Sequence, residues 1–303
     1  MDEDEDDGGV GFTLSVSSPD KILFPDGRIT KGHLVDYYTA VEPWMLAHLR
    51  ERPLTLHRFP GGIEGRGFYQ KRIDDEAPRW VERAAVPREG DAPIVHPLAN
   101  NGATLLYFAN QNAIALHVCP VRRPRFDRPD LVVFDLDPSD DDFEKVRLGA
   151  RHLGAMLGAI GLEPFVKTTG SRGLHVVAPI EPDGDHDQVR DFARAVAEVL
   201  CRRDPARFTL EVAKKRRGDR VFVDLRNAPA QTFVAPYSVR ALPGAPVSAP
   251  ITWKEVEDPA LHGRAFTLRD VPARLRATGD PWREIAAAAR PLAAARARLA
   301  SLG

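Results

Sequence analysis

The sequence predicts an α+β fold whose centre is a split-βαβ core of the ferredoxin type. Residues 131–225 alternate short apolar runs with two longer segments of helical spacing, in the order β-α-β-β-α-β. Residues 12–118 carry strand and helix patterns of their own, which predicts an N-terminal α/β module packed on the core. The chain has 303 residues, of which 43% are hydrophobic, and this is enough to bury a substantial core.

The module at 12–118 begins with a turn at Pro25-Asp26-Gly27, followed by a helix that Thr30 caps. The apolar stripe of this helix consists of Leu34, Tyr37, Tyr38 and Val41. The stretch LTLHRF alternates as a strand does, and the glycine-rich loop PGGIEGRG leads into FYQKR. We expect two further short strands, ATLLYFA at 103–109 and AIALHV at 113–118.

The core occupies 119–245. Its first strand is LVVFDLD at 131–137, followed by a helix from Asp140 to Ile160 that Ser139 or Asp140 caps and Gly161 ends. The second strand is LEPFVKTT, the turn is GSRG, and the third strand is LHVVAPI, which is apolar enough to be buried on both faces. A second helix runs from Asp187 to Arg202, and RVFVDL closes the core after an extended FTLEV. The last segment, 246–303, is expected to be partly helical.

Two carboxylates end the first strand of the core. Asp135 and Asp137 lie two residues apart, so both project from one face of the strand. In the ferredoxin-type order the first strand lies between the third, which carries His175, and the last, which carries Asp224. Three carboxylates this close repel each other unless a cation neutralises them. Because clusters of oxygen ligands suit magnesium or manganese, the sequence predicts a metal site here.

The turn in KTTGSRGLHVV is rich in hydroxyl groups and glycine, and Arg172 adds a positive charge. Exposed backbone N–H groups in such a turn can bind phosphate oxygens. The alternatives are an ordinary Gly-Ser hairpin turn and, for His175, a histidine satisfied within the core. The neighbouring carboxylates favour a phosphate site for both.

Charge is distributed unevenly along the chain. Residues 2–7 are all acidic, and we expect residues 1–11 to form a disordered, solvated tail. Without these six residues the chain has 42 basic and 37 acidic residues, a formal net charge of +5. Basic residues gather in CPVRRPRFDR and KKRRGDR, which are either solvated surface or sites for an anionic partner.

Several classes of protein are disfavoured. No apolar run approaches 18 residues, so we expect no membrane partner, and the acidic start is not a secretory signal. Cys119 and Cys201 are isolated, which argues against a disulfide framework and a structural zinc and favours a reducing cytoplasm.

Two other functions compete with a metal-dependent transferase. DLDPS resembles the motif of haloacid-dehalogenase phosphatases, in which Asp135 would be the nucleophile. About 130 residues precede the motif here and a β-turn-β unit follows, whereas that family places it at the start of a doubly wound domain. A DNA-end-binding or bridging module with weak catalysis would use the basic patches, but it does not need the three carboxylates.

Five motifs in one order give residues 13–275 a close resemblance to the polymerase domain of the bacterial DNA ligase D family. They are SSPDKILFPDGRITKGHLVDYY, RPLTLHRFPGGIEGRGFYQKR, FDLDP, TTGSRGLHVVAPI and VFVDLRN, the last continued by VAPYSVRALPGAPVSAPITWKEV. That family belongs to the archaeo-eukaryotic primase superfamily and works in non-homologous end joining. The resemblance implies one primase-polymerase domain over 12–303, with a ferredoxin/RRM-like catalytic core. It also implies a DNA-dependent DNA/RNA polymerase that extends DNA ends and fills short gaps, with ribonucleotides favoured over dNTP.

The resemblance also implies roles for individual residues. Asp135, Asp137 and Asp224 would bind two Mn²⁺ or Mg²⁺ ions for in-line phosphoryl transfer to a primer 3′-hydroxyl. Phe68 or Tyr69 would stack on a base, and Lys21 and Lys31 would bind the 5′-phosphate on the downstream side of a gap. The residues assigned to the triphosphate pocket or its nucleotide are His117, Thr169, Ser171, Arg172, His175, Arg217, Asn227 and Arg240.

The sequence departs from the family pattern at two places. Arg172 stands where the family often has Lys, and LRN replaces QN after Asp224, which leaves the role of Arg226 open. The 303 residues contain no K-x-D-G ligase motif, so we expect a stand-alone polymerase or an excised domain. The expected partners are DNA ends, gapped or primer-template DNA, NTP or dNTP, Ku and a separate DNA ligase, in a bacterial, nucleoid-associated, cytoplasmic location.

Overall fold

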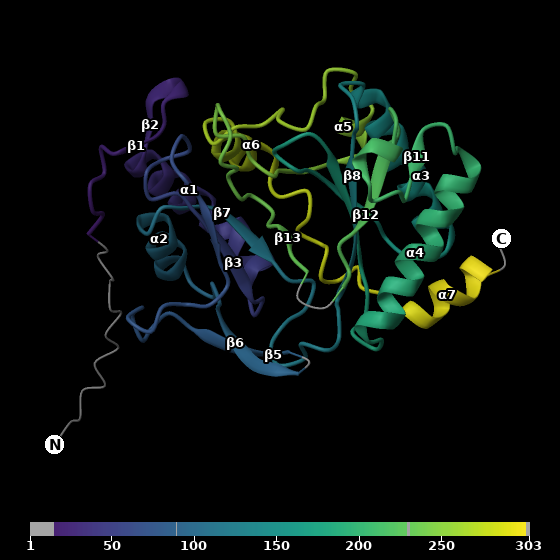
Figure 1. Ribbon diagram of the computed structural model, residues 1–303, viewed down its shortest axis with the longest axis horizontal. Helices are drawn as coiled ribbons and strands as arrows, with labels where there is room; N and C mark the ends of the chain where they lie inside the picture. Colours follow the sequence, from purple (N-terminus) through teal and green to yellow (C-terminus); the bar gives the residue numbers. More distant parts are fainter. Residues whose placement is uncertain (1–14, 89, 229–230, 301–303) are drawn as a thin grey trace.

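Two β-sheets flanked by helices form the body of the molecule (Figure 1). The computed structural model describes residues 15–88, 90–228 and 231–300, so the acidic tail expected at 1–11 lies outside the described residues. The mixture of helices and sheets confirms the α+β class. The larger sheet has six strands in the order β11-β12-β8-β10-β9-β14, and the smaller has four in the order β13-β7-β3-β4.

The larger sheet contains the elements expected between residues 131 and 225. Their bounds are β8 (Leu131–Asp137), α3 (Phe143–Ala159), β9 (Phe165–Thr168), β10 (Leu174–Pro179), α4 (His186–Arg203), β11 (Phe208–Thr209) and β12 (Val221–Leu225), to which β14 (Pro250–Ile251) adds an edge. β8 lies between β10 and β12 and pairs antiparallel with both, so the first strand is flanked by the third and the last, as expected. The phosphatase alternative requires a doubly wound parallel sheet, and the antiparallel neighbours of β8 do not fit it.

The smaller sheet belongs to the N-terminal part of the chain. It consists of β3 (Leu54–Arg58), β4 (Phe68–Gln70), β7 (Ala113–Val118) and β13 (Phe233–Val234). Around it lie the pair β1 (Ile22–Phe24) and β2 (Ile29–Thr30), the one-turn 3₁₀ helix Asp26–Arg28, α1 (Lys31–Leu49), the hairpin of β5 (Arg83–Arg88) and β6 (Asp91–Pro97), and α2 (Gly102–Asn110). Thr30 caps α1 through its hydroxyl and the backbone of His33, and the expected stripe of Leu34, Tyr37, Tyr38 and Val41 is buried.

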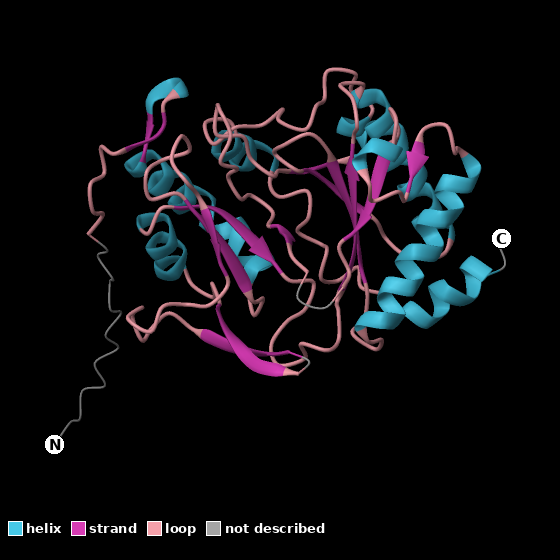
Figure 2. Cartoon of the chain, viewed as in Figure 1, coloured by secondary structure: helices cyan, strands magenta, loops and turns pink. Residues whose placement is uncertain are grey.

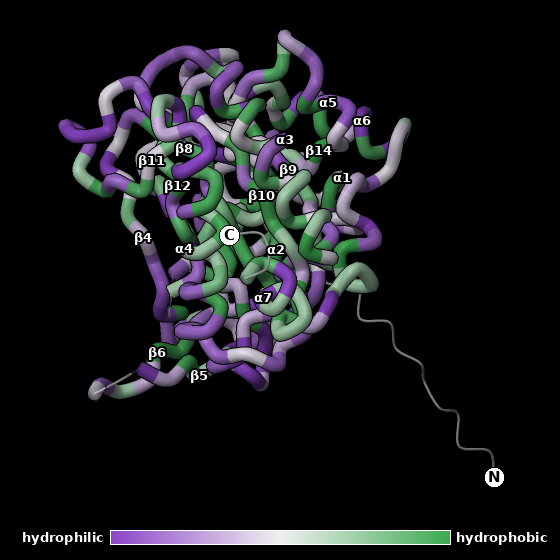
Figure 3. The backbone as a smooth tube through the Cα atoms, turned by 90° about the vertical axis from the view of Figure 1, so that its right-hand side faces the viewer, coloured by the Kyte–Doolittle hydropathy of each residue, from purple (hydrophilic) through white to green (hydrophobic). Residues whose placement is uncertain are grey.

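The two faces of β8 pack against different partners. Val132, Phe134 and Leu136 join the apolar side chains of α3 and α4, which cover the outer side of the larger sheet (Figure 2). Leu131 and Val133 instead join the core of the N-terminal part. Hydrophobic segments gather inside the molecule around β9 and β10 (Figure 3). By alternation, Asp135 and Asp137 lie on the side that faces the smaller sheet.

Three predictions about helices need correction. Residues 103–109 are not a strand but most of α2, because Thr104, Leu105, Phe108 and Ala109 are buried at helical spacing and Asn101 accepts a hydrogen bond from the N–H of Thr104. α3 begins later than expected, since the carboxylate of Asp142 caps it while Ser139 and Asp140 bind other groups. α4 begins one residue earlier, where Asp185 and Gln188 form a capping box.

The C-terminal segment is partly helical, as expected, with α5 (Trp253–Val256), α6 (Val271–Thr278) and α7 (Leu292–Ala300). Its Asp280 is buried and accepts hydrogen bonds from the Tyr237 hydroxyl, from His48 Nε2 at 2.7 Å and from the backbone N–H of Trp282 at 2.8 Å. The indole of Trp282 donates to the carbonyl of Val166 on β9. One carboxylate thus joins α1, the segment after β13 and the C-terminal segment. Within the described ranges, no helix is long and apolar enough to cross a membrane.

Candidate active site

A row of ionisable side chains crosses four strands of the larger sheet. The hydrogen-bond register places Asp224 of β12 opposite Asp135 of β8, Asp135 opposite His175 of β10, and His175 opposite Lys167 of β9. Residues that are paired in register project from the same face of a sheet, so the row follows from strand pairing alone. Sequence reasoning found three of the four members. It missed Lys167, whose only signal is a charged residue inside the buried strand FVKT.

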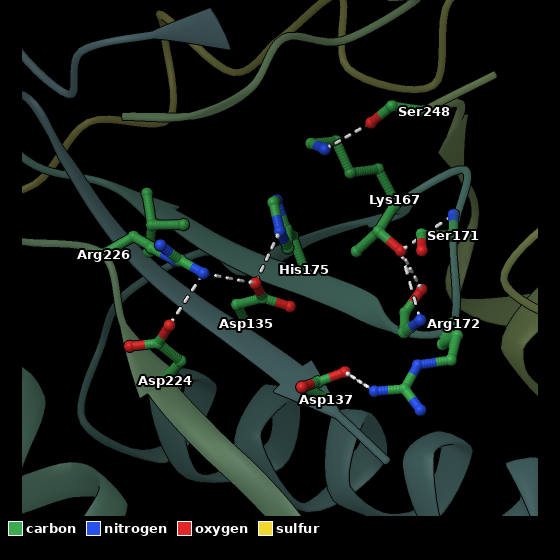
Figure 4. A network of polar contacts seen from close by, with 12 residues as sticks. Asp135, Asp137, Lys167, Ser171, Arg172, His175, Asp224, Arg226 and Ser248 are labelled. Atoms are coloured by element: carbon green, nitrogen blue, oxygen red, sulfur yellow. Dashed lines mark hydrogen bonds and ion pairs between the residues drawn. The ribbon is translucent and has the colours of Figure 1, made fainter. Parts of the chain in front are cut away.

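Arginines neutralise the three carboxylates (Figure 4). Nη2 of Arg226 lies 3.4 Å from Asp135 Oδ2 and 2.8 Å from Asp224 Oδ2. Asp137 is approached by Arg172 Nη2 at 3.1 Å and by Arg217 Nη1 at 3.6 Å. The repulsion that the sequence predicts among the carboxylates is therefore relieved by guanidinium groups in this structure.

The row perturbs the pKa values of its members. Burial alone would raise the pKa of Asp135, but His175, Arg226 and Lys167 together lower it to about 2, so the carboxylate is ionised at neutral pH. Burial raises the pKa of Asp224, and Arg226 opposes this rise. Burial and the charge of Lys167 lower the pKa of His175 to about 4. Burial and Arg240 hold the pKa of Lys167 well below its usual value, against the attraction of Asp135.

A cavity of about 370 Å³ opens in front of this row, between the two sheets. Nine predicted site residues line it, namely Tyr69, His117, Asp135, Asp137, Thr169, Ser171, Arg172, His175 and Arg240, and Arg226 and Phe233 join them. A larger cavity of about 430 Å³ shares Phe233 with it and is lined by the arginine run 122–128, but it contains none of the predicted site residues.

The turn at 169–173 is built differently from the expectation. The backbone N–H groups of Ser171 and Gly173 do not face the cavity as free donors but donate to the hydroxyl of Thr169, at 3.2 and 3.1 Å. A side chain at Gly173 would clash with the carbonyl of Leu136, since its Cβ would lie 2.0 Å from that oxygen. The glycine therefore allows the turn to pack against the end of β8. Any phosphate bound here would be contacted mainly by side chains.

Arg240 and two histidines present polar nitrogen atoms to the cavity. Nη1 of Arg240 donates to the carbonyl of Thr169 at 3.1 Å, and burial lowers the pKa of its guanidinium. The imidazole atoms His117 Nε2 and His175 Nδ1 are buried, and neither has a hydrogen-bond partner among the described residues. Burial first, and Arg240 second, hold the pKa of His117 well below its usual value. Two unpartnered ring nitrogens beside arginines fit a site that binds a polar, anionic group.

The two aromatic candidates on β4 project from opposite faces, as neighbours on a strand do. The ring of Tyr69 lines the cavity, stacks on His57 with 4.0 Å between ring centroids, and is 59% exposed. Phe68 instead contacts the guanidinium of Arg58 and lines a different hollow. The structure therefore brings Tyr69, but not Phe68, to the candidate site.

Two predicted nucleotide ligands lie outside the cavity lining. Both ends of the buried Asn227 amide bind the backbone of Val133, with Oδ1 accepting and Nδ2 donating at 2.9 Å, so this side chain extends the pairing of β12 with β8. Arg217 donates to the carbonyls of Glu211 and Val212 and lies 3.8 Å over the ring of Phe222. We therefore assign Asn227 a structural position and Arg217 a position behind Asp137.

Lys21 and Lys31 are brought together as expected, at a distance from the cavity. The backbone N–H of Lys31 donates to the carbonyl of Lys21 at 2.8 Å, across the β1–β2 pair. Lys21 is exposed, whereas Lys31 is buried and its ammonium donates to Ser17 Oγ and to the carbonyl of Asn110, both at 3.0 Å. Burial and the neighbouring charge of Lys21 lower the pKa of Lys31. The backbones of the two lysines are thus adjacent, and of the two ammonium groups that of Lys21 belongs to the exposed side chain.

The donor set fits a hard divalent cation in its chemistry, since ionised carboxylates on adjacent strands supply only oxygen ligands. The positions of the side chains, in contrast, are not those of an assembled metal site. Among residues 15–88, 90–228 and 231–300, no three His, Cys, Asp or Glu side chains are placed to hold one ion together. The carboxylates are turned toward guanidinium groups instead.

Comparisons with known proteins agree on one family. Residues 30–282 match the model of the LigD primase-polymerase domain. The chain is 33% identical over 277 residues to a multifunctional non-homologous end joining DNA repair protein LigD of Mycobacterium tuberculosis, and 33% identical over 291 residues to LigD of Pseudomonas aeruginosa. These matches cover 88% and 94% of this chain but 36% and 34% of the relatives, so the chain spans about a third of their length.

The fold agrees as well. The polymerase domain from Mycobacterium tuberculosis ligase D, solved in complex with DNA, superposes with a TM-score of 0.86 at 32% identity. The match covers 91% of this chain and 99% of that domain. The resemblance that the sequence motifs indicate is thereby confirmed.

Proposed function

Because the chain belongs to the LigD primase-polymerase family, we propose that it is a template-directed nucleotidyltransferase that extends DNA ends and fills short gaps in end joining. One observation carries the proposal. Asp135 and Asp137 line a cavity whose other walls present arginine, histidine and an exposed tyrosine, and Asp224, outside this lining, lies opposite Asp135 on the adjacent antiparallel strand. Carboxylates that bind cations and donors that bind phosphate meet in one place, which is the requirement of phosphoryl transfer from a nucleoside triphosphate.

The three carboxylates would hold two Mn²⁺ or Mg²⁺ ions, which supply the Lewis-acid activation of a primer 3′-hydroxyl and neutralise charge on the phosphates. Asp135 is suited to this role because it is ionised at neutral pH and fixed by the register of β8 with its neighbours. Asp137, at the mouth of the cavity, is one third exposed and thus accessible to a substrate.

Side chains around the cavity would orient the nucleotide. Arg240 and Arg172 can donate to triphosphate oxygens, and so can Nε2 of His117 in the tautomer that protonates this nitrogen. The exposed ring of Tyr69 can stack on a base, and stacking accepts any base. By the family resemblance, we propose that ribonucleotides are preferred over deoxyribonucleotides.

The test is primer extension. Labelled primer-template DNA is incubated with one nucleoside triphosphate, as ribose or deoxyribose form, and with Mn²⁺ or Mg²⁺. We expect template-directed extension by the wild-type chain and none by Asp135→Asn, which keeps the shape of the side chain. A shift of the DNA in a gel without extension would favour a DNA-end-binding module, and release of phosphate from small esters would favour a phosphatase. Either result would overturn the proposal.

A further inference from the structure

Asp135 and Asp224 already share a cation, which is the guanidinium of Arg226. A single nitrogen, Nη2, lies between Asp135 Oδ2 and Asp224 Oδ2, at 3.4 and 2.8 Å (Figure 4). No other guanidinium in the described part of the chain bridges two of the three carboxylates, since Arg172 and Arg217 both approach Asp137 alone. Asp135 and Asp224 are two of the carboxylates that would hold a divalent cation, and here this guanidinium neutralises both of them.

We propose that Arg226 is an internal counter-cation that occupies the divalent-cation position of the free protein, and that binding of the ion expels it. This inference rests on the proposed function and deepens it, because it assigns a regulatory role to a residue that the family pattern leaves open. It explains why ionised carboxylates from adjacent strands are nevertheless not arranged to hold an ion together. In this proposal, the arrangement around the guanidinium is the metal-free form of the site, in which Arg226 occupies the carboxylates.

Arg226 is built to leave without disturbing the sheet. Its backbone N–H donates to the carbonyl of Val133 at 3.2 Å, which fixes the main chain at the end of β12. The side chain is 35% exposed and, among the described residues, its hydrogen bonds and ion pairs are those to Asp135 and Asp224. Arg217, in contrast, is held by two backbone carbonyls and an aromatic ring. The Arg226 guanidinium also lines the cavity, so it remains near the site after release.

Competition for the same oxygens makes a quantitative expectation possible. A divalent ion that used these carboxylates would have to displace a guanidinium whose Nη2 lies 3.4 and 2.8 Å from their oxygens, and at an effective dielectric constant near 20 a charge this close to the carboxylates changes ion affinity strongly. Partial exposure of the arginine weakens this effect through screening. We therefore expect Arg226→Gln, which removes the charge and keeps much of the length, to bind Mn²⁺ about tenfold more tightly than the wild-type chain.

The experiment measures Mn²⁺ binding by electron paramagnetic resonance of the free ion, without nucleotide or DNA. The titrations compare the wild-type chain with Arg226→Gln, with Asp135→Asn, and with Arg125→Gln. The last variant removes the same charge from an exposed arginine at the rim of the other cavity, which forms no ion pair with a described residue. Tighter binding by Arg226→Gln alone, with binding lost in Asp135→Asn, supports the inference.

The failures of the two proposals can be told apart. Binding that needs Asp135 but is equal in wild type, Arg226→Gln and Arg125→Gln overturns the inference and leaves the proposed function standing. Binding that does not change in Asp135→Asn overturns the metal site of the proposed function and the inference with it. Crystals of the wild-type chain with and without Mn²⁺ give a second measurement that needs no variant. There the separation of Arg226 Nη2 from Asp224 Oδ2 should increase from 2.8 Å to beyond hydrogen-bond range. An unchanged bridge beside a bound ion would overturn the inference.

Discussion

Removal of the Asp280 carboxylate should destabilise the protein more than most single substitutions. Asp280→Ala leaves the Tyr237 hydroxyl, His48 Nε2 and the N–H of Trp282 without their acceptor, and all three residues are buried. Each buried polar group left unpaired costs about 1–3 kcal/mol, and loss of one partner from a buried charged network costs about 3–5 kcal/mol. We expect the free energy of unfolding to fall by about 3–5 kcal/mol rather than by the sum of the separate costs. Water that enters the vacated space will form hydrogen bonds with some of the unpaired groups.

The assay is equilibrium unfolding in urea, followed by tryptophan fluorescence, at several pH values. Burial opposes ionisation of Asp280, but His48 and Tyr237 hold its pKa below the usual value. A carboxylate with a lowered pKa in the folded state stabilises the protein above the pKa of the unfolded chain, about 3.9, and loses this contribution as the pH falls through the folded value. The part of the difference between wild type and Asp280→Ala that comes from ionisation of this carboxylate should therefore persist down to about pH 5 and shrink below about pH 4.

Glu284→Ala is the matched control, since this nearby carboxylate is exposed and, among the described residues, its ion pair is with Arg283 at 3.4 Å. We expect the control to change the free energy of unfolding by less than about 0.5 kcal/mol. A loss below about 1 kcal/mol in Asp280→Ala, or a difference that grows on acidification, would refute the reasoning that the ionised carboxylate holds the three segments together.

Three further predictions concern function. Asp137→Ala should abolish primer extension but change DNA affinity less than about twofold, because cationic side chains bind the DNA phosphates; near-normal extension would remove Asp137 from the metal site. Arg240→Ala should raise the KM for nucleotide about tenfold in steady-state assays, since its guanidinium beside Thr169 faces the cavity; an effect on DNA affinity alone would contradict this. Lys21→Ala should abolish any preference for gapped DNA with a downstream 5′-phosphate over a 5′-hydroxyl, measured at one salt concentration, whereas Lys31→Ala should also lower the melting temperature because its ammonium has partners inside the protein. An unchanged preference in Lys21→Ala would move the phosphate site to the arginines at 122–128.

The positions of the carboxylates could be predicted from the sequence more completely than those of the other residues of the candidate site. Period-2 alternation placed Asp135 and Asp137 on one face, and strand order placed Asp224 and His175 beside them; both are rules of backbone geometry. The bridge that Arg226 forms between two carboxylates could not be predicted in the same way, because the reach of a long side chain depends on three-dimensional position. The Arg226 contacts and the buried Lys167 became visible only in the structure.

Local sequence patterns gave wrong predictions where the same residues fit both a helical and a strand periodicity. ATLLYFA is apolar enough for a strand, but Asn101 caps it as a helix, and the burial of Leu105 and Phe108 fixes that choice. The turn at 169–173 had the composition of a phosphate-binding loop, yet the Thr169 hydroxyl takes up two of its N–H groups. In such cases a short side chain can accept the hydrogen bonds of the backbone N–H groups. Composition alone does not show which acceptor those groups will bind.

The row from Asp224 through Asp135 and His175 to Lys167 has a consequence for how the chain folds. A slip of β10 or β12 by one residue would turn His175 or Asp224 to the opposite face, among the apolar side chains that pack on α3 and α4. An ionised carboxylate or an imidazole without hydrogen-bond partners is strongly unfavourable in that apolar layer. The same charges that would carry out the chemistry thus disfavour wrong alignments of the sheet. A chain that has acquired its native pairing has, by that fact, brought together the side chains of the proposed site.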